Sequence, residues 1–125
     1  MDTKELGFLA ENIAARHLES KGYRVIERNF RKPWGEIDVI AAKDGALYFV
    51  EVKANRQEFI GDFNPEVRVK PEKLSKIIKT AALYMTQETS APKAEWQVDI
   101  ISVTFNQSTK KAKIKHFKNV AEDYS

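Results

Sequence analysis

Residues 35–53, which read GEIDVIAAKDGALYFVEVK, decide the fold that this sequence predicts. Apolar and polar residues alternate from Glu36 to Ile40, and residues 47–52 form one of the most strand-favouring runs in the chain. Between them stands Asp44-Gly45, a strong signal for a two-residue turn. The stretch is therefore predicted to be a β-hairpin at the centre of the fold.

The flanking sequence predicts two helices and three further strands. Apolar residues recur at helical spacing from Leu6 to Leu18, after a capping box formed by Asp2 and Glu5 and before a Lys21-Gly22 stop. Pro71 opens a second amphipathic helix, which residues 90–92 are expected to end. Strands are expected at residues 23–30, 96–105 and 111–117, and a long loop follows Lys53 up to about Arg68. The order αβββαββ predicts an α/β domain whose mixed central sheet is flanked by helices.

Length and composition bound the class of protein. The 125 residues fit a single domain, expected at residues 1–120, with a polar tail at residues 121–125. Cysteine is absent, which excludes disulfides and thiolate chemistry, and no long apolar run indicates a signal peptide or a membrane partner. A cytoplasmic protein is expected. The net charge of +3 permits a polyanionic partner without requiring one.

The register of the predicted hairpin indicates a metal site. A symmetric turn at Asp44-Gly45 places Asp38 opposite Glu51 and Glu36 opposite Lys53, with all four side chains on one face. Facing carboxylates repel each other and need a cation, a shared proton or distance to coexist. A hard divalent cation, Mg²⁺ or Mn²⁺, would resolve the conflict. The Lys53 ammonium could then stabilise charge on a phosphate. The alternative is an ordinary solvated sheet face with weak ion pairs.

Glu11 is a further candidate ligand. Its helical neighbours are small or apolar, so a purely solvating glutamate is less expected there. It could bind the metal or a metal-bound water, or it could simply lie at the edge of the buried stripe. Both interpretations stay open on spacing alone.

Five motifs in order carry a resemblance to a known family, and they run through residues 6–103. They are Gly7…Glu11…Ala14, Lys21-Gly22-Tyr23, Arg28-Asn29-Phe30-Arg31, Gly35-Glu36-Ile37-Asp38 and Phe49-Val50-Glu51-Val52-Lys53. The chain resembles the YraN family, which is similar to archaeal Holliday-junction resolvases within the PD-(D/E)XK, or restriction-endonuclease-like, class. The resemblance implies an αβββαβ core, to which this chain adds a C-terminal strand, and a site that acts on phosphodiesters.

Residue by residue, the resemblance implies a catalytic set of Asp38, Glu51, Lys53 and Glu11. Asp38, Glu51 and Glu11 would be the ligands of Mg²⁺ or Mn²⁺, and Lys53 the catalytic lysine. The chain departs from the family at Gln97-Val98-Asp99, where Arg-Phe-Asp is usual, and Asp99 is interpreted as a support of the fold. The arginine that often follows the catalytic lysine is replaced by Asn55 or shifted to Arg56, and neither is assigned to the site.

Clustered basic residues favour a nucleic-acid partner, DNA rather than RNA, although no base-reading motif is present. The predicted contacts are Arg31, Lys32, Lys70 and Lys73. Lys73 also matches a basic position of the family's second helix, although an ordinary solvated lysine of a helix is an equally good interpretation of it. Phe59 and Phe63 could stack on unpaired bases or fold back on the domain. The two histidines give little support to a histidine-centred mechanism.

The function predicted from sequence is that of a metal-dependent endonuclease acting on branched or single-stranded DNA. A non-cleaving nucleic-acid-binding module and an interaction protein on the same fold are the alternatives. The oligomeric state is open, a homodimer included.

Overall fold

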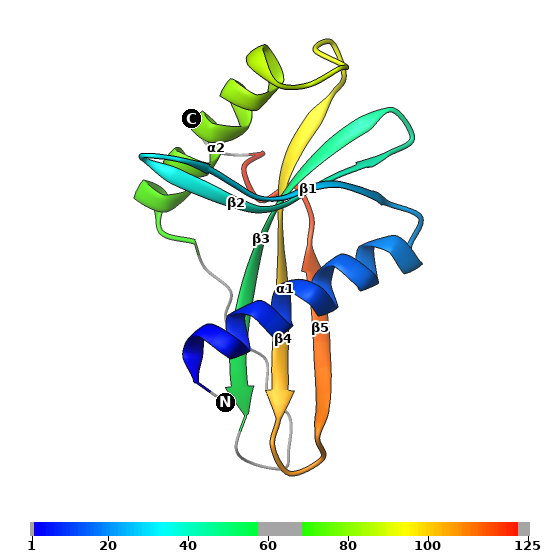
Figure 1. Ribbon diagram of the computed structural model, residues 1–125, viewed down its shortest axis with the longest axis vertical. Coiled ribbons are helices and arrows are strands. Elements are labelled where there is room, and N and C mark those ends of the chain that lie inside the picture. The colour runs from blue at the N-terminus through cyan, green and yellow to red at the C-terminus, as the bar shows by residue number, and fades with distance from the viewer. Residues whose placement is uncertain (1, 58–68, 123–125) are drawn as a thin grey trace.

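The computed structural model describes residues 2–57 and 69–122. Its helices and strands follow the order expected from the sequence (Figure 1). They are α1 (Thr3–Ser20), β1 (Arg24–Lys32), β2 (Gly35–Lys43), β3 (Ala46–Gln57), α2 (Pro71–Gln87), β4 (Trp96–Asn106) and β5 (Lys111–Phe117). The predicted αβββαβ core with an added C-terminal strand is therefore confirmed.

Local sequence signals explain where these elements begin and turn. The Asp2 carboxylate accepts a hydrogen bond from the backbone N–H of Glu5 at 2.8 Å, which caps α1. Asp44 and Gly45 both have positive φ, at 49° and 80°, as a two-residue turn between antiparallel strands requires. Pro71 stands in the first turn of α2, where its missing N–H costs nothing.

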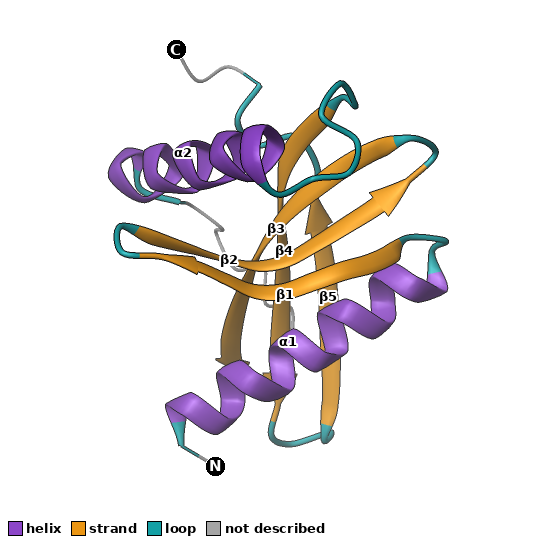
Figure 2. Cartoon of the chain, turned by 45° about the horizontal axis from the view of Figure 1, so that its top comes forward, coloured by secondary structure: helices purple, strands orange, loops and turns teal. Residues whose placement is uncertain are grey.

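The five strands form one mixed sheet in the order β1-β2-β3-β4-β5. The β3–β4 pair is parallel, with α2 as the crossover, and the other neighbours are antiparallel. Figure 2 shows the two helices on opposite sides of the sheet. Ile40 and Phe49 pack with residues of α2, whereas their chain neighbours Val39 and Val50 pack with residues of α1.

The sheet divides between β2 and β3, and this division positions the candidate site. The β2–β3 ladder runs from Lys43–Ala46 to Val39–Val50, while β3 continues beside β4 to the Gln57–Asn106 pair. Beyond the ladder the β1–β2 hairpin crosses the direction of β3 (Figure 1). Asp38 and Glu51 lie one residue beyond the last pair of this ladder, Val39–Val50.

The ends of β3 and α2 differ from the sequence prediction. β3 continues to Gln57, into the expected loop, because its backbone pairs with β4 over its whole length. α2 ends at Gln87, before the Ser-Ala-Pro segment that was expected to end it. Phe59 and Phe63, predicted to stack or fold back, lie outside the described residues. The N–H of Val120 donates to the carbonyl of Val98 at 2.8 Å, so the segment after β5 returns to β4.

Within residues 2–57 and 69–122, no helix is long and apolar enough to cross a membrane.

Candidate functional site

Asp38 and Glu51 form a pair of carboxyl groups at the division of the sheet. The Oδ2 atom of Asp38 accepts a hydrogen bond from the backbone N–H of Val52 at 2.8 Å, which ties β2 to β3 beyond their ladder. Glu51 is only 7 % exposed. Burial, followed by the hydrogen bond and the charge of Glu51, raises the pKa of Asp38 to about 8. The pair therefore holds a proton at neutral pH unless a cation takes its place.

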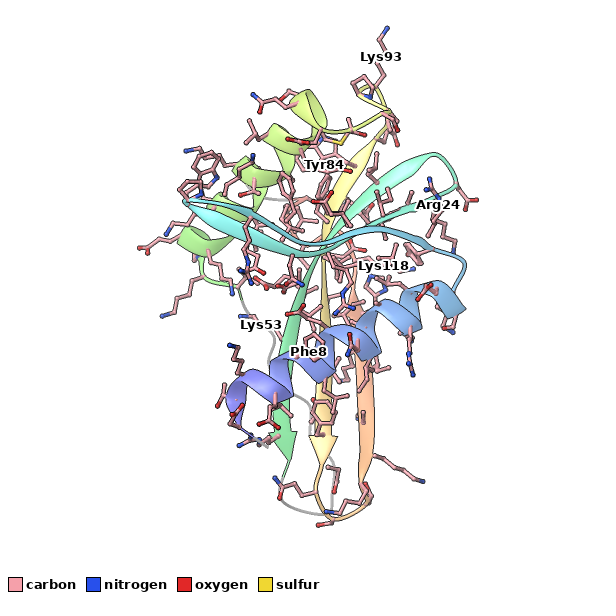
Figure 3. The ribbon with its side chains drawn as sticks, in the orientation of Figure 1. Phe8, Arg24, Lys53, Tyr84, Lys93 and Lys118 are labelled. Carbon is pink, nitrogen blue, oxygen red and sulfur yellow. The ribbon has the colours of Figure 1, made fainter. Side chains whose placement is uncertain are left out.

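Two lysines face these carboxyl groups. The Nζ atom of Lys73, on the first turn of α2, lies 3.0 Å from Oε2 of Glu51. Burial and the positive charge of Lys73 lower the pKa of Lys53, while Glu51 and Asp38 oppose that effect. In Figure 3, Lys53 lies beside β3, below the crossing of the β1–β2 hairpin. The cluster therefore combines two acids and two bases on β2, β3 and α2.

Sequence reasoning did not place Lys73 beside the carboxyl pair. It predicts a contact of Lys73 with nucleic acid, and in the structure the Lys73 ammonium also pairs with Glu51. Hairpin register cannot reveal this contact, because it joins β3 to a helix twenty residues further along the chain. The family resemblance, which marks a basic position on the second helix, was the signal that could have found it.

Glu11 lies within electrostatic reach of Asp38 but has its own partner. Its Oε1 atom is 3.7 Å from Nη2 of Arg28, and its charge contributes to the raised pKa of Asp38. Burial raises the pKa of Glu11 itself, against a hydrogen bond from Asn29 and the charge of Arg28. Among residues 2–57 and 69–122, no group of three His, Cys, Asp or Glu side chains is arranged to hold a metal ion.

The donor atoms of the pair nevertheless fit a hard cation. Oε2 of Glu51 is buried and has no hydrogen-bond partner in the described part of the chain, and only the ammonium of Lys73 faces it as an ion pair. Mg²⁺ and Mn²⁺ bind through one or two carboxylates, water and substrate phosphate rather than a complete protein cage. Asp38 and Glu51 therefore suit such an ion with substrate oxygens in its other positions.

The remaining predicted DNA contacts lie at the end of β1 and at the start of α2. Arg31 is exposed and pairs with Glu36 at 3.3 Å, Lys32 lies 5.3 Å above the ring of Phe30, and Lys70 is the exposed N-cap residue of α2. The expected position of Glu36 opposite Lys53 is wrong, because the β2–β3 ladder ends at Val39 and Glu36 turns to Arg31 instead.

Asp99 belongs to a separate buried network. Its carboxylate accepts hydrogen bonds from Nε2 of Gln97 at 2.8 Å and from the backbone N–H of Asn119 at 2.9 Å, and it lies 2.8 Å from Nε2 of His116. Burial alone raises the pKa of Asp99, but these partners outweigh burial and hold the pKa below its ordinary value. The contacts join β5 and the following segment to β4, which agrees with the interpretation of Asp99 as a support of the fold.

The αβββαβ core, with paired carboxyl groups on β2 and β3 and a lysine two residues further along β3, places the chain in the PD-(D/E)XK nuclease-like fold class. The profile of the uncharacterised protein family UPF0102 matches residues 10–103. The chain belongs to this family, and the resemblance to the YraN family is thereby confirmed.

Several UPF0102 proteins of bacteria are similar over most of the chain. The Campylobacter hominis protein is 38 % identical over 117 residues, which are 94 % of either chain. The Campylobacter fetus protein is 40 % identical over 92 % of either chain. The Wolinella succinogenes protein is 46 % identical over 86 residues, 69 % of this chain and 75 % of its own.

Proposed function

We propose that this protein is a metal-dependent nuclease that hydrolyses phosphodiester bonds in DNA. The observation that carries the proposal is the contact between Asp38 and Glu51 at the division of the sheet, with Lys53 and Lys73 beside them. The turn and the ladder fix the register of the hairpin, and Asp38 adds one hydrogen bond beyond the ladder, from the backbone N–H of Val52. Two mutually repelling acids at such a place are better explained by a cation that they share.

Asp38 and Glu51 would hold Mg²⁺ or Mn²⁺, which when bound supplies Lewis-acid polarisation of the phosphate and an acidified water. Asp38 must give up its proton for the pair to act as an anionic ligand. Lys53 would stabilise the negative charge that develops on the phosphate, and its lowered pKa reflects the same confined surroundings. Glu11, on α1, would orient water at the edge of the cluster.

The substrate would be held by Arg31, Lys32, Lys70 and Lys73, whose positive charges attract the phosphates of DNA. Lys73 would exchange its pairing with Glu51 for a phosphate oxygen once the carboxylates are neutralised. A nuclease-like module that binds without cutting remains the competing function. It would use the same basic surface and would not need Lys53.

The decisive experiment is a cleavage panel in Mn²⁺ over single-stranded, duplex, flap and four-way DNA. Wild-type protein is expected to cut at least one substrate, and EDTA to abolish the cutting. Lys53→Ala should leave folding, metal binding and most salt-dependent affinity in place while lowering the cleavage rate by about a hundredfold or more, as loss of a transition-state contact does.

Lys118→Ala, at an exposed lysine away from the cluster, is the matched control and should cut as wild type does (Figure 3). Binding without cutting by the wild type on every substrate, or undiminished cutting by Lys53→Ala, would leave the binding module as the function.

A further inference from the structure

A row of lysines on α2 leads away from the candidate site. Lys73, Lys76 and Lys79 follow one another at three-residue spacing, and all three are exposed. Lys73 faces Glu51 of β3. A side chain at Gly35 would lie 3.5 Å from Cβ of Lys76, and Nζ of Lys79 lies 4.3 Å from the ring centroid of Trp34. The row therefore runs from the carboxyl pair along the tip of the β1–β2 hairpin.

The turn of this hairpin is fastened to the helix. Nε1 of Trp34 donates a hydrogen bond to Oγ1 of Thr80 at 3.1 Å, and that hydroxyl donates to the carbonyl of Lys76 at 2.7 Å. Thr80 is fully buried. The lysines beside this contact therefore lie where hydrogen bonds join α2 to the hairpin whose strand β2 carries Asp38.

The charge of this surface is positive. The hairpin adds Arg31 and Lys32 to the lysines of α2, and the acids of the same region are Glu36 and Glu72. Glu36 is already paired with Arg31. Among the residues of α2 and the β1–β2 hairpin tip that the structure describes, the remaining cations outnumber the carboxylate of Glu72, so an anionic partner gains more from this surface than a neutral one.

The dimensions of the row suit one strand of a duplex. The six helical steps from Lys73 to Lys79 rise about 9 Å. Phosphates of one strand follow about every 3.4 Å along a duplex axis, which gives about three phosphates in reach of the row. Binders of single strands add aromatic rings on which bases stack. The Trp34 ring is instead covered by the Lys79 ammonium, which makes it a support for a cation.

We propose that Lys76 and Lys79 bind the phosphate backbone of a double-stranded DNA arm that extends from the carboxyl pair along α2 and the β1–β2 hairpin. The inference rests on the proposed function, because the carboxyl pair defines where the arm begins. Beyond the proposed function, the inference says that the DNA beside the site is double-stranded and that this duplex lies along α2 and the β1–β2 hairpin.

The test compares two double variants with equal loss of charge. Lys76→Gln/Lys79→Gln removes two lysines of the row. Lys93→Gln/Lys118→Gln removes two exposed lysines that belong neither to α2 nor to the β1–β2 hairpin (Figure 3). Affinity for a fluorescently labelled duplex oligonucleotide is measured by anisotropy in EDTA over a range of salt concentrations. The row variant should bind about tenfold or more weakly, with its log–log salt slope reduced by about two, since two phosphate contacts are lost.

Lys76→Arg/Lys79→Arg keeps both charges and should restore the affinity, which separates lost charge from a disturbed helix. The control variant should bind as the wild type does. An unchanged salt slope in the row variant, an equal loss in the control, an equal loss for single-stranded DNA, or a wild type without affinity for the duplex would overturn the inference. Because EDTA prevents cleavage, this result is independent of the proposed chemistry. If the wild type binds duplex through the row but never cuts DNA, the proposed nuclease function is refuted and the binding of duplex DNA by the row stands.

Discussion

At the scale of single residues, the proton on the Asp38–Glu51 pair is the feature with the most direct consequence. A carboxyl group whose pKa is raised in the folded state favours folding most below its unfolded pKa, and the advantage is lost as pH rises through the folded pKa. For Asp38 this window runs from about 4 to about 8. Between these limits the metal-free protein progressively loses stability through this site.

Asp38→Asn should therefore change stability in a pH-dependent way. At pH 5 the wild-type Asp38 side chain is already neutral in the folded protein, so the substitution should lower the free energy of unfolding only slightly. At pH 9 the buried Asp38 carboxyl of the wild type is charged beside Glu51, so the amide should make the metal-free protein more stable than the wild type. Denaturant unfolding in EDTA at both pH values measures the difference. A difference that is the same at pH 5 and pH 9 would mean that Asp38 does not hold a proton in the folded protein.

The same substitution tests the metal. An ion that binds only the folded protein raises the apparent stability, so millimolar Mn²⁺ should raise the Tm of the wild type, and more strongly at pH 8 than at pH 6, where the proton competes. Asp38→Asn should remove most of this increase. Asp44→Asn, which makes the same change of charge in the exposed hairpin turn, should keep it. Equal increases in Tm for both variants would show that Mn²⁺ binds elsewhere.

At the scale of elements, the position of the site depends on how closely β2 approaches α2. A Cβ atom added at Gly35 would lie 3.1 Å from Oγ1 of Thr80, and this hydroxyl is fixed by hydrogen bonds with Trp34 and the carbonyl of Lys76. The glycine of the Gly-Glu-Ile-Asp motif is thus required by space rather than by chemistry. It allows the strand that carries Asp38 to lie against the helix that carries Lys73.

Gly35→Ala should accordingly destabilise the fold, by about 1–3 kcal/mol, as overpacking of a fixed contact does. Gly7→Ala is the matched control. It lies inside α1 with no atom within 4 Å of an added Cβ, so alanine should stabilise the helix there by about 0.5–1 kcal/mol. Thermal or denaturant unfolding of both variants should show a lower stability than the wild type for Gly35→Ala and a higher stability for Gly7→Ala. A Gly35→Ala protein as stable as the wild type would show that Thr80 can move aside.

The sequence predicts the local parts of the candidate site but not the contacts between elements distant in the chain. The turn at Asp44-Gly45 fixes the hairpin register locally, so the sequence alone brings Asp38 near Glu51. The end of the β2–β3 ladder at Val39–Val50 was not predictable in this way, because it depends on β3 continuing beside β4, a strand some fifty residues away in the chain. The contact of Lys73 with Glu51 is non-local for the same reason, and local spacing carries no signal for it.

At the scale of the whole molecule, the two faces of the sheet separate stability from the candidate chemistry. The carboxyl pair meets α2 through Lys73. Asp99 lies on the other face, where its charge acts on Tyr23, a member of the cluster that packs with α1. Because consecutive residues of a strand point to opposite faces, the fold can be weakened on one face without rearranging the other.

Asp99→Asn tests this separation. The amide weakens the contact with His116 and cannot accept all the hydrogen bonds that the carboxylate accepts, so the free energy of unfolding at pH 7 should fall by about 1–3 kcal/mol. The lowered pKa of Asp99 gives a contribution that is present above its unfolded pKa and lost as pH falls through the folded pKa, so the deficit should shrink under strongly acidic conditions. The increase in Tm on adding Mn²⁺ should match that of the wild type, because Asp38 and Glu51, the proposed metal ligands, remain in place. Thermal melts with and without Mn²⁺ give both quantities for one protein. Loss of the Mn²⁺ response in a folded Asp99→Asn protein would contradict the separation and would make the Asp99–His116 network part of the metal site.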